Sequence, residues 1–115
     1  MRDEALFDRA NGFRSSICGG QENTALGMVA IVTGGLGNWA TGAYSSVSGG
    51  SANAANSVFA SVSGGHGNQA NGDGSSVSGG QDNTATALYS SISGGFSHVV
   101  TGYWDWAAGS LWQDQ

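Results

Sequence analysis

Several residue types are scarce or absent in this chain of 115 residues. It contains no proline and no lysine, and its only cysteine is Cys18. Proline cannot donate the backbone hydrogen bond that a strand ladder needs, so its absence suits a chain built mostly of paired strands. A single cysteine excludes a disulfide within the chain, and it leaves both the redox compartment and the role of Cys18 open.

Positive charge and long apolar runs are scarce as well. The chain contains three arginines and eight acidic residues, which gives a net charge of −5 at pH 7. A basic stripe for phosphate backbones or anionic lipid is therefore missing, and we expect no nucleic-acid partner. No apolar run approaches the ~20 residues of a membrane-spanning helix, and residues 1–14 lack the apolar segment of a signal peptide. We expect no membrane insertion, and neither a signal nor an anchor within this sequence.

Glycine is abundant, and it recurs at a fixed interval. The chain has 21 glycines, and residues 15–104 divide into six consecutive units of 15 residues without an insertion or deletion, in the pattern SSVSGGxxNxAxGxx. A fixed period is typical of a solenoid, in which each turn buries its apolar face against its neighbours. The sequence predicts an all-β fold, a parallel β-roll (β-solenoid) of 15-residue turns.

Partial repeats at both ends extend the predicted coil to about seven turns. Residues 8–14 match the second half of a unit, and residues 105–110 match a degraded first half. We therefore divide the chain into an N-terminal cap at residues 1–7, a β-roll domain at residues 8–110 and a C-terminal tail or cap at residues 111–115.

Alternation within the unit predicts which side chains face inward. The third residue of SSVSGG is β-branched in every unit, so it faces inward and its two neighbours face outward. The glycine pair is expected where the chain turns through positive φ or where backbones approach closely. The inward column predicted in this way consists of Ile17, Val32, Val47, Val62, Val77 and Ile92.

A second inward column is polar. A buried amide without a partner costs about 1 to 3 kcal/mol, so we expect each amide to bond to a corner backbone or to the amides above and below. The alternative is a track for a ligand or a metal. The column consists of Asn23, Asn38, Asn53, Asn68, Asn83 and then His98.

The outward positions of the first strand are small and nearly uniform, whereas those of the second strand vary from unit to unit. A uniform small surface suits close contact with another copy of the roll or with an ordered water lattice, and recent duplication of the repeat would also produce it. We predict an interaction face made of Ser46, Ser48, Ser61, Ser63, Ser76, Ser78, Ser91 and Ser93.

Aromatic residues recur immediately before the first strand, at Tyr44, Phe59, Tyr89 and Trp104. Rings one turn apart gain about 0.5 to 1.5 kcal/mol per pair by stacking, so this corner stripe is either a hydrophobic spine or an interface. Trp104, Trp106 and Trp112 gather near the C-terminal end, where the last turn exposes unpaired backbone. We expect them to cap the roll, with docking of a further module as the alternative.

Catalytic and cofactor sites find little support in the sequence. His66 and His98 lie in different columns, and no acidic residue shares a column with either. A nucleophile with a base and an orienting acid is therefore not indicated. The segment NGDG at residues 71–74 is a single turn signal rather than a repeated calcium motif. We expect no enzyme activity, no cofactor and no metal.

The units NTALG, NWATG, NQANG and HVVTG, which alternate with SSVSGG, resemble the head repeats of YadA-like trimeric autotransporter adhesins. They are also similar to the xxNxVxG repeat of grass ice-recrystallisation inhibitors. Both families are left-handed parallel β-rolls, so the resemblance implies that handedness here. It covers about nine-tenths of the chain. Adhesin heads commonly carry SVAIG, with Val and Ile outward at a trimer seam, whereas SSVSG places the large residue inward.

These observations predict a non-catalytic structural or adhesive module that lies outside the cell or on its surface. It would associate with copies of itself, as a trimer or a filament, or bind a host or matrix surface through its flat repetitive faces. The alternative function is ice binding through the serine face.

Overall fold

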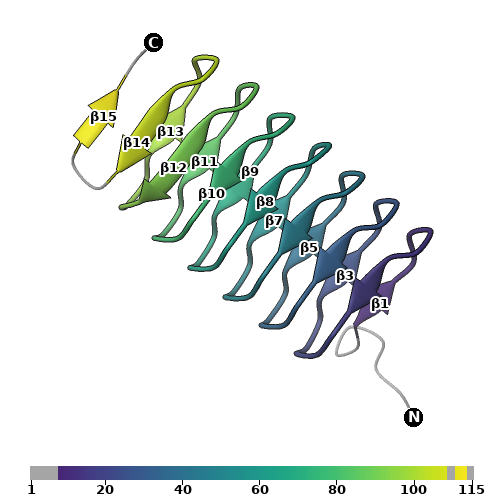
Figure 1. Cartoon of the computed structure of the whole chain (residues 1–115). Coiled ribbons are helices and arrows are strands. Elements are labelled where there is room, and N and C mark those ends of the chain that lie inside the picture. The colour runs from purple at the N-terminus through teal and green to yellow at the C-terminus, as the bar shows by residue number, and fades with distance from the viewer. Residues whose placement is uncertain (1–7, 109–110, 114–115) are drawn as a thin grey trace.

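The computed structural model describes residues 8–108 and 111–113, with side chains for residues 8–108. Fifteen short strands form two sheets, and the described part of the chain contains no helix. A helix long and apolar enough to cross a membrane is accordingly not found among these residues. Successive turns follow one another along a single axis (Figure 1), and the molecule extends over 50 × 24 × 16 Å. The predicted β-solenoid of about seven turns is confirmed.

The seven-stranded sheet, here called the Ala sheet, takes one strand from the NxAxG half of each unit. Its strands are β1 (Arg9–Ala10), β3 (Thr24–Ala25), β5 (Trp39–Ala40), β7 (Ala54–Ala55), β9 (Gln69–Ala70), β11 (Thr84–Ala85) and β13 (Val99–Val100).

The eight-stranded sheet, here called the Ser sheet, takes its strands from the SSVSGG half. Its strands are β2 (Ser16–Ile17), β4 (Ile31–Val32), β6 (Ser46–Val47), β8 (Ser61–Val62), β10 (Ser76–Val77), β12 (Ser91–Gly94), β14 (Trp106–Ala108) and β15 (Leu111–Gln113).

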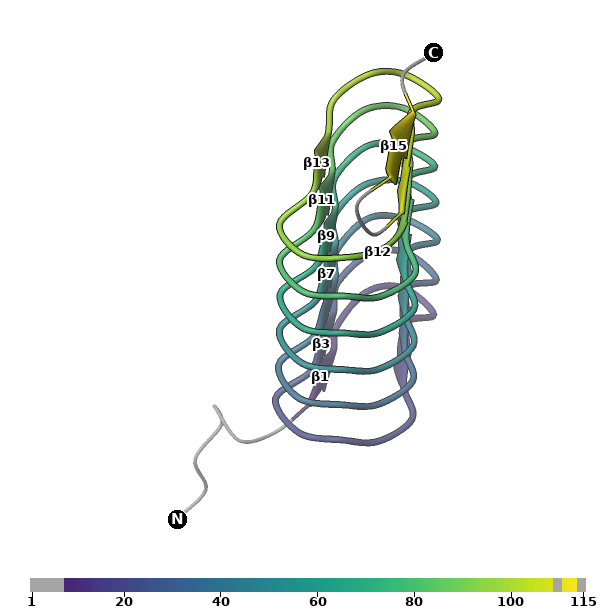
Figure 2. The ribbon, with the colours of Figure 1, turned by 90° about the vertical axis from the view of Figure 1, so that its left-hand side faces the viewer.

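The parallel strands pair in a register of one repeat unit. Ser46 pairs with Ser61, and Ala54 pairs with Gln69. Figure 2 shows the strands of the two sheets in two straight rows on opposite walls of the coil. A third parallel ladder of single bridges follows the corner after the glycine pair, and alternation in the sequence did not predict it. Its members are Gln21, Leu36, Ser51, His66, Gln81 and Phe96.

The core is a thin layer between the two sheets. From Val32 to Ile92 the predicted β-branched column is fully buried, whereas Ile17 in the first turn is only partly buried. A further inward column, not predicted from the sequence, is formed by the first residue of each SSVSGG motif. Its members Ser45, Ser75 and Ser90 are buried. The Ser45 hydroxyl donates a hydrogen bond of 2.6 Å to the carbonyl of Gly42, so its burial leaves no donor unpaired.

The asparagine column is structural, and its amides bond to backbone rather than to one another. Asn38 Nδ2 donates to the carbonyls of Gly34 at 2.9 Å and Gly50 at 3.1 Å. Its Oδ1 accepts the backbone N–H of Asn53 at 3.0 Å. Among the described residues, no buried side-chain nitrogen or oxygen lacks a hydrogen-bond partner. Each amide therefore connects the corner backbone of its own turn to that of the next turn, and the predicted bonding to the corner is confirmed.

The two glycines of each pair differ, so the prediction that both are needed is wrong for the first. The second glycine has φ between 85° and 112° in every unit. A Cβ on Gly50 would collide with the carbonyl oxygen of Gly65 in the next turn. A Cβ on the first glycine, Gly49, would meet nothing within 4 Å. The fold therefore requires glycine only at the second position.

The C-terminal end is closed by two devices. Strand β15 pairs antiparallel with β14 and continues the Ser sheet, which places residues 111–113 in a strand. At Gly102 an added Cβ would meet the carboxylate of Asp105, whereas at Gly27 it would meet the carbonyl oxygen of the following turn. The Asp105 carboxylate therefore occupies the place of the next turn's peptide oxygen.

At the N-terminal end, Asp8 Oδ1 accepts the backbone N–H of Asn23 at 2.9 Å, as the asparagines from Asn23 to Asn83 do for the turn that follows each of them. The predicted cap at residues 1–7 lies outside the described residues. The side chain of Trp112 also lies outside them, so the predicted tryptophan cluster is described only for Trp104 and Trp106.

Candidate interaction face

The eight serines predicted as an interaction face lie together on the outward side of the Ser sheet. Ser46 in β6 and Ser48, directly after it, face outward on either side of the buried Val47. The parallel register repeats this pair in four consecutive turns, from β6 to β12. The resulting hydroxyl floor consists of Ser46, Ser48, Ser61, Ser63, Ser76, Ser78, Ser91 and Ser93.

The hydroxyl floor is a rectangular array. Neighbouring strands lie about 4.8 Å apart, and alternate residues along one strand lie about 6.6 Å apart. The first serine of each pair is half-buried and the second is exposed. Because serine occupies all eight positions of the floor, no side chain within it rises above its neighbours.

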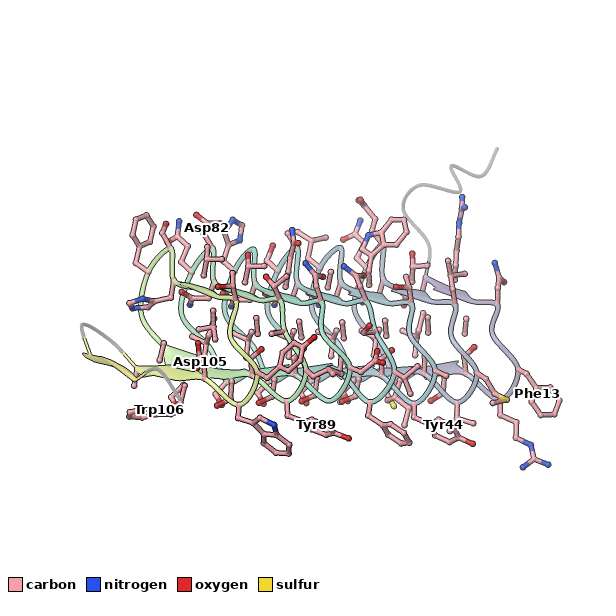
Figure 3. All side chains as sticks on the ribbon, turned by 90° about the horizontal axis from the view of Figure 1, so that it is seen from above. Phe13, Tyr44, Asp82, Tyr89, Asp105 and Trp106 are labelled. Atoms are coloured by element: carbon pink, nitrogen blue, oxygen red, sulfur yellow. The ribbon has the colours of Figure 1, made fainter. Side chains whose placement is uncertain are left out.

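An aromatic stripe borders this floor. It consists of Tyr44, Phe59, Tyr89 and Trp104. Tyr44 lies two residues before Ser46, in the turn that leads into β6, and the buried Ser45 separates them. Figure 3 shows Tyr44 and Tyr89 projecting on the same side of the ribbon as Trp106, the outward residue of β14.

The stripe is made of two stacked pairs rather than one continuous spine. The rings of Tyr44 and Phe59 have centroids 5.2 Å apart, and those of Tyr89 and Trp104 have centroids 4.6 Å apart. Gly74 occupies the position between the pairs, and the ring of Tyr89 leans over it, since a Cβ there would lie 2.7 Å from the ring atoms Cδ1 and Cε1. All four rings stay about half exposed or more, from 47% for Tyr44 to 64% for Phe59.

The stripe residues have a backbone conformation that aromatic residues rarely adopt. Their φ values are 58° at Tyr44, 60° at Phe59, 55° at Tyr89 and 67° at Trp104. The left-handed region costs a residue with a Cβ about 1 to 2 kcal/mol, and stacking returns about 0.5 to 1.5 kcal/mol per pair. The two pairs therefore recover only part of the cost at four positions. Gly74, at φ 70°, is the residue that the turn itself would favour.

The floor has a boundary at both ends and one low edge. Trp106 reaches across the C-terminal end, where its Nε1 donates a hydrogen bond of 2.9 Å to Ser93 Oγ. Ile31, 38% exposed, stands at the N-terminal end. Opposite the stripe, the row of first glycines leaves open space at every turn. This glycine edge consists of Gly34, Gly49, Gly64, Gly79 and Gly94.

Few charged side chains lie on this face. In the outward columns that contain Tyr44, Ser46 and Ser48, Arg14 is the only charged residue among those described. It lies in the first turn, over the ring of Phe13. Asp82 projects on the opposite side of the ribbon (Figure 3). Asp73 lies at the tip of a turn, where its Oδ1 accepts a hydrogen bond of 2.7 Å from Ser57 Oγ.

The outward face of the Ala sheet is irregular by comparison. Trp39 and Val99 are exposed there, and Gln69 lies between smaller side chains. A short polar row runs along it, in which Asn56 Nδ2 donates to Asn71 Oδ1 at 2.8 Å and Asn56 Oδ1 accepts from Thr41 Oγ1 at 3.0 Å. This face therefore offers no repeated array.

The remaining candidate residues are dispersed. His66 belongs to the corner ladder, and His98 ends the asparagine column, where its backbone N–H donates to Asn83 Oδ1. Cys18 is an exposed free thiol in the first turn. Within residues 8–108 and 111–113, no group of three or more His, Cys, Asp or Glu side chains is placed to hold a metal ion.

The feature that sequence reasoning missed at this face is the glycine edge. Identical glycine pairs suggested one shared role, and only the positions of neighbouring atoms separate the two. The sequence also did not predict the positive φ of the stripe, because aromatic residues are not typical of that conformation.

Comparison with protein-family models finds no match to this chain, and no curated protein sequence matches it significantly.

Proposed function

We propose that this domain is a non-catalytic structural module that works through the outward face of the Ser sheet, by contacting copies of itself or a matching surface. The observation that carries the proposal is the hydroxyl floor. Four consecutive turns present the same pair of serines in register on an uncharged face, whereas the Ala sheet varies in every turn.

Such a face suits binding by many weak and equivalent contacts. A single serine contributes little, but contacts on a rigid scaffold act together, so that the second and later ones form at a high effective concentration. The aromatic stripe adds apolar area next to the polar array, and aromatic residues are enriched at contact centres. Both features favour association over catalysis.

The resemblance of the NxAxG and SSVSGG units to adhesin heads supports a place outside the cell or on its surface. In that setting the module would be part of an adhesive head or a fibre, as a homo-oligomer or in contact with a host or matrix surface.

The experiment compares two double variants of equal charge. Ser61→Lys with Ser76→Lys places two charges on the hydroxyl floor, and Gln69→Lys with Thr84→Lys places two on the Ala sheet. Light scattering over a concentration series, electron microscopy and adsorption to a hydroxyl-terminated monolayer would measure association. We expect the floor variant to lose association and the Ala-sheet variant to keep it. A wild-type chain that stays monomeric and does not adsorb would refute the proposal.

Ice binding through the same face is the second candidate, favoured by the regular spacing of the hydroxyl floor. The raised stripe and Trp106 oppose it, because they interrupt the plane that a crystal surface would meet. The test is inhibition of ice recrystallisation at micromolar protein. Inhibition that is lost in the floor variant would support ice binding, and its absence in the wild type would exclude it.

A further inference from the structure

We infer that the outward face of the Ser sheet binds a second copy of this chain face to face. The two coils lie parallel and are related by a two-fold axis, so that the aromatic stripe of each copy lies along the glycine edge of the other. This inference rests on the proposed function and specifies its partner and its geometry.

The exposed area of the face is sufficient for a stable pair. With about 200 Å² for a whole aromatic side chain, the four rings of the stripe expose roughly 450 Å². Ile31, Trp106 and the eight serines of the hydroxyl floor add to it. The sum is on the order of the ~800 Å² that each partner buries in an interface of standard size.

The charge distribution favours contact through this face. Two chains of net charge −5 repel one another when acidic surfaces meet. In the described turns, the outward columns that contain Tyr44, Ser46 and Ser48 carry no acidic side chain. Pairing through this face therefore brings uncharged surfaces together and leaves Asp82 of each copy on the far side.

The glycine edge identifies the orientation. Inside one chain nothing requires glycine there, because a Cβ would meet no atom within 4 Å. In the parallel two-fold arrangement, the raised stripe of one copy meets the low glycine edge of the other, and the two hydroxyl floors can approach. In an antiparallel arrangement stripe would meet stripe, which would hold the floors apart and leave both glycine edges unfilled.

The backbone of the stripe supports the same partner. Aromatic residues are present at four positive-φ positions where the turn itself favours glycine, as at Gly74. Stacking within one chain involves only one face of each ring at Tyr44 and Trp104, the outer members of the two pairs. Contact with the glycine edge of a second copy gives the outward edges of all four rings a partner.

Cross-linking tests the orientation. The first serine of each pair lies near the middle of the face, between the aromatic stripe and the glycine edge, so each such serine comes close to its own counterpart across a parallel two-fold axis. In a Cys18→Ser background, we expect Ser46→Cys alone and Ser91→Cys alone each to give a covalent dimer with a short bifunctional thiol reagent. Gln69→Cys on the Ala sheet is the matched control and should stay monomeric. Cross-linking only in a mixture of the Ser46 and Ser91 variants would indicate antiparallel coils and overturn the inference.

A glycine variant separates association from folding. Tyr44→Gly with Phe59→Gly suits the positive φ at both positions, so we expect the fold to persist by circular dichroism. We expect the dimer dissociation constant to rise at least about tenfold, as for the loss of central aromatic contacts in other interfaces. Phe96→Ala is the control, because Phe96 is equally exposed but belongs to the corner ladder.

The possible results separate this inference from the proposed function. Self-association that survives the glycine variant but is lost in the floor variant would overturn this geometry and leave the proposed function standing. Cross-linking through the Ala sheet would overturn both. A wild-type monomer that still adsorbs to a hydroxylated surface would also overturn the dimer geometry and leave the proposed function standing. A monomer that does not adsorb would overturn both.

Discussion

At the scale of single residues, this fold depends on a few positions with strict requirements and tolerates change at many others. The buried asparagines each connect their own corner to the next turn, and the second glycine of each pair allows successive corners to approach. Between these fixed points, no two turns carry the same pair of outward residues on the Ala sheet. Substitutions at neighbouring glycines should therefore have opposite outcomes.

Gly50→Ala and Gly49→Ala form a matched pair that tests this difference. Gly50 has φ 85° and faces the carbonyl of Gly65, so alanine there should lower the free energy of unfolding by about 2 kcal/mol or more. Gly49 faces open space, so alanine there should change it by less than about 0.5 kcal/mol. Urea denaturation below the concentration of self-association would measure both. Equal effects would contradict the assignment of separate roles.

Alternation in the sequence correctly predicted the inward-facing residues, such as Val47 and Asn53. Val47 lies in β6 and Asn53 directly precedes β7, and at both places the side chains alternate between the core and the outside. Prediction from the sequence failed where the chain turns, because turn geometry depends on φ rather than on side-chain polarity. Phe59 is the clearest case, since an aromatic residue gives no indication that its φ is 60°.

At the scale of strands and sheets, the Ser sheet differs from the Ala sheet in its C-terminal end. Strand β13 ends the Ala sheet, whereas β15 turns back and pairs antiparallel with β14. Exposed strand edges act as templates for other strands, and a strand that reverses direction interrupts the parallel pattern. The sequence predicted a tail or a cap here without its direction, because residues 111–113 lie outside the repeat.

Removing residues 109–115 tests the role of β15. The truncated chain would expose the backbone of β14, so we expect a lower melting temperature and concentration-dependent end-to-end association. Size-exclusion chromatography with light scattering would detect the larger species. The control is the full-length chain carrying Gln113→Pro, which leaves the length unchanged and removes one backbone donor from β15. An unchanged melting temperature in both variants would show that β15 has no capping role.

At the scale of the whole molecule, the coil is a linear array in which each turn contacts its two neighbours. Stability should then be nearly the sum of equal contributions from the turns. The 15-residue period places the same column above itself in every turn, and the sequence predicted this property in full because no insertion or deletion interrupts the repeat. This prediction of the register does not depend on the resemblance to β-rolls, because the 15-residue period alone determines the register.

Deleting residues 60–74 tests the additive description. This change removes one whole unit, so we expect a folded coil one turn shorter, with the urea dependence of unfolding reduced in proportion. Deleting residues 60–67 would instead shift the register within the coil and should prevent folding of the C-terminal half. Circular dichroism and urea titration would compare the two. Failure of the whole-unit deletion to fold would show that the turns are not independent.

The carboxylate of Asp105 has a consequence for how such a chain can evolve. By occupying the place that a peptide oxygen of the following turn takes elsewhere in the coil, it ends the regular stacking at this turn without any contribution from the interior. Duplication of an internal segment would therefore lengthen the molecule in steps of one rung and leave its terminus unaltered. Length, and with it the number of serine rows that can act at once, becomes a quantity that selection can adjust independently of the fold.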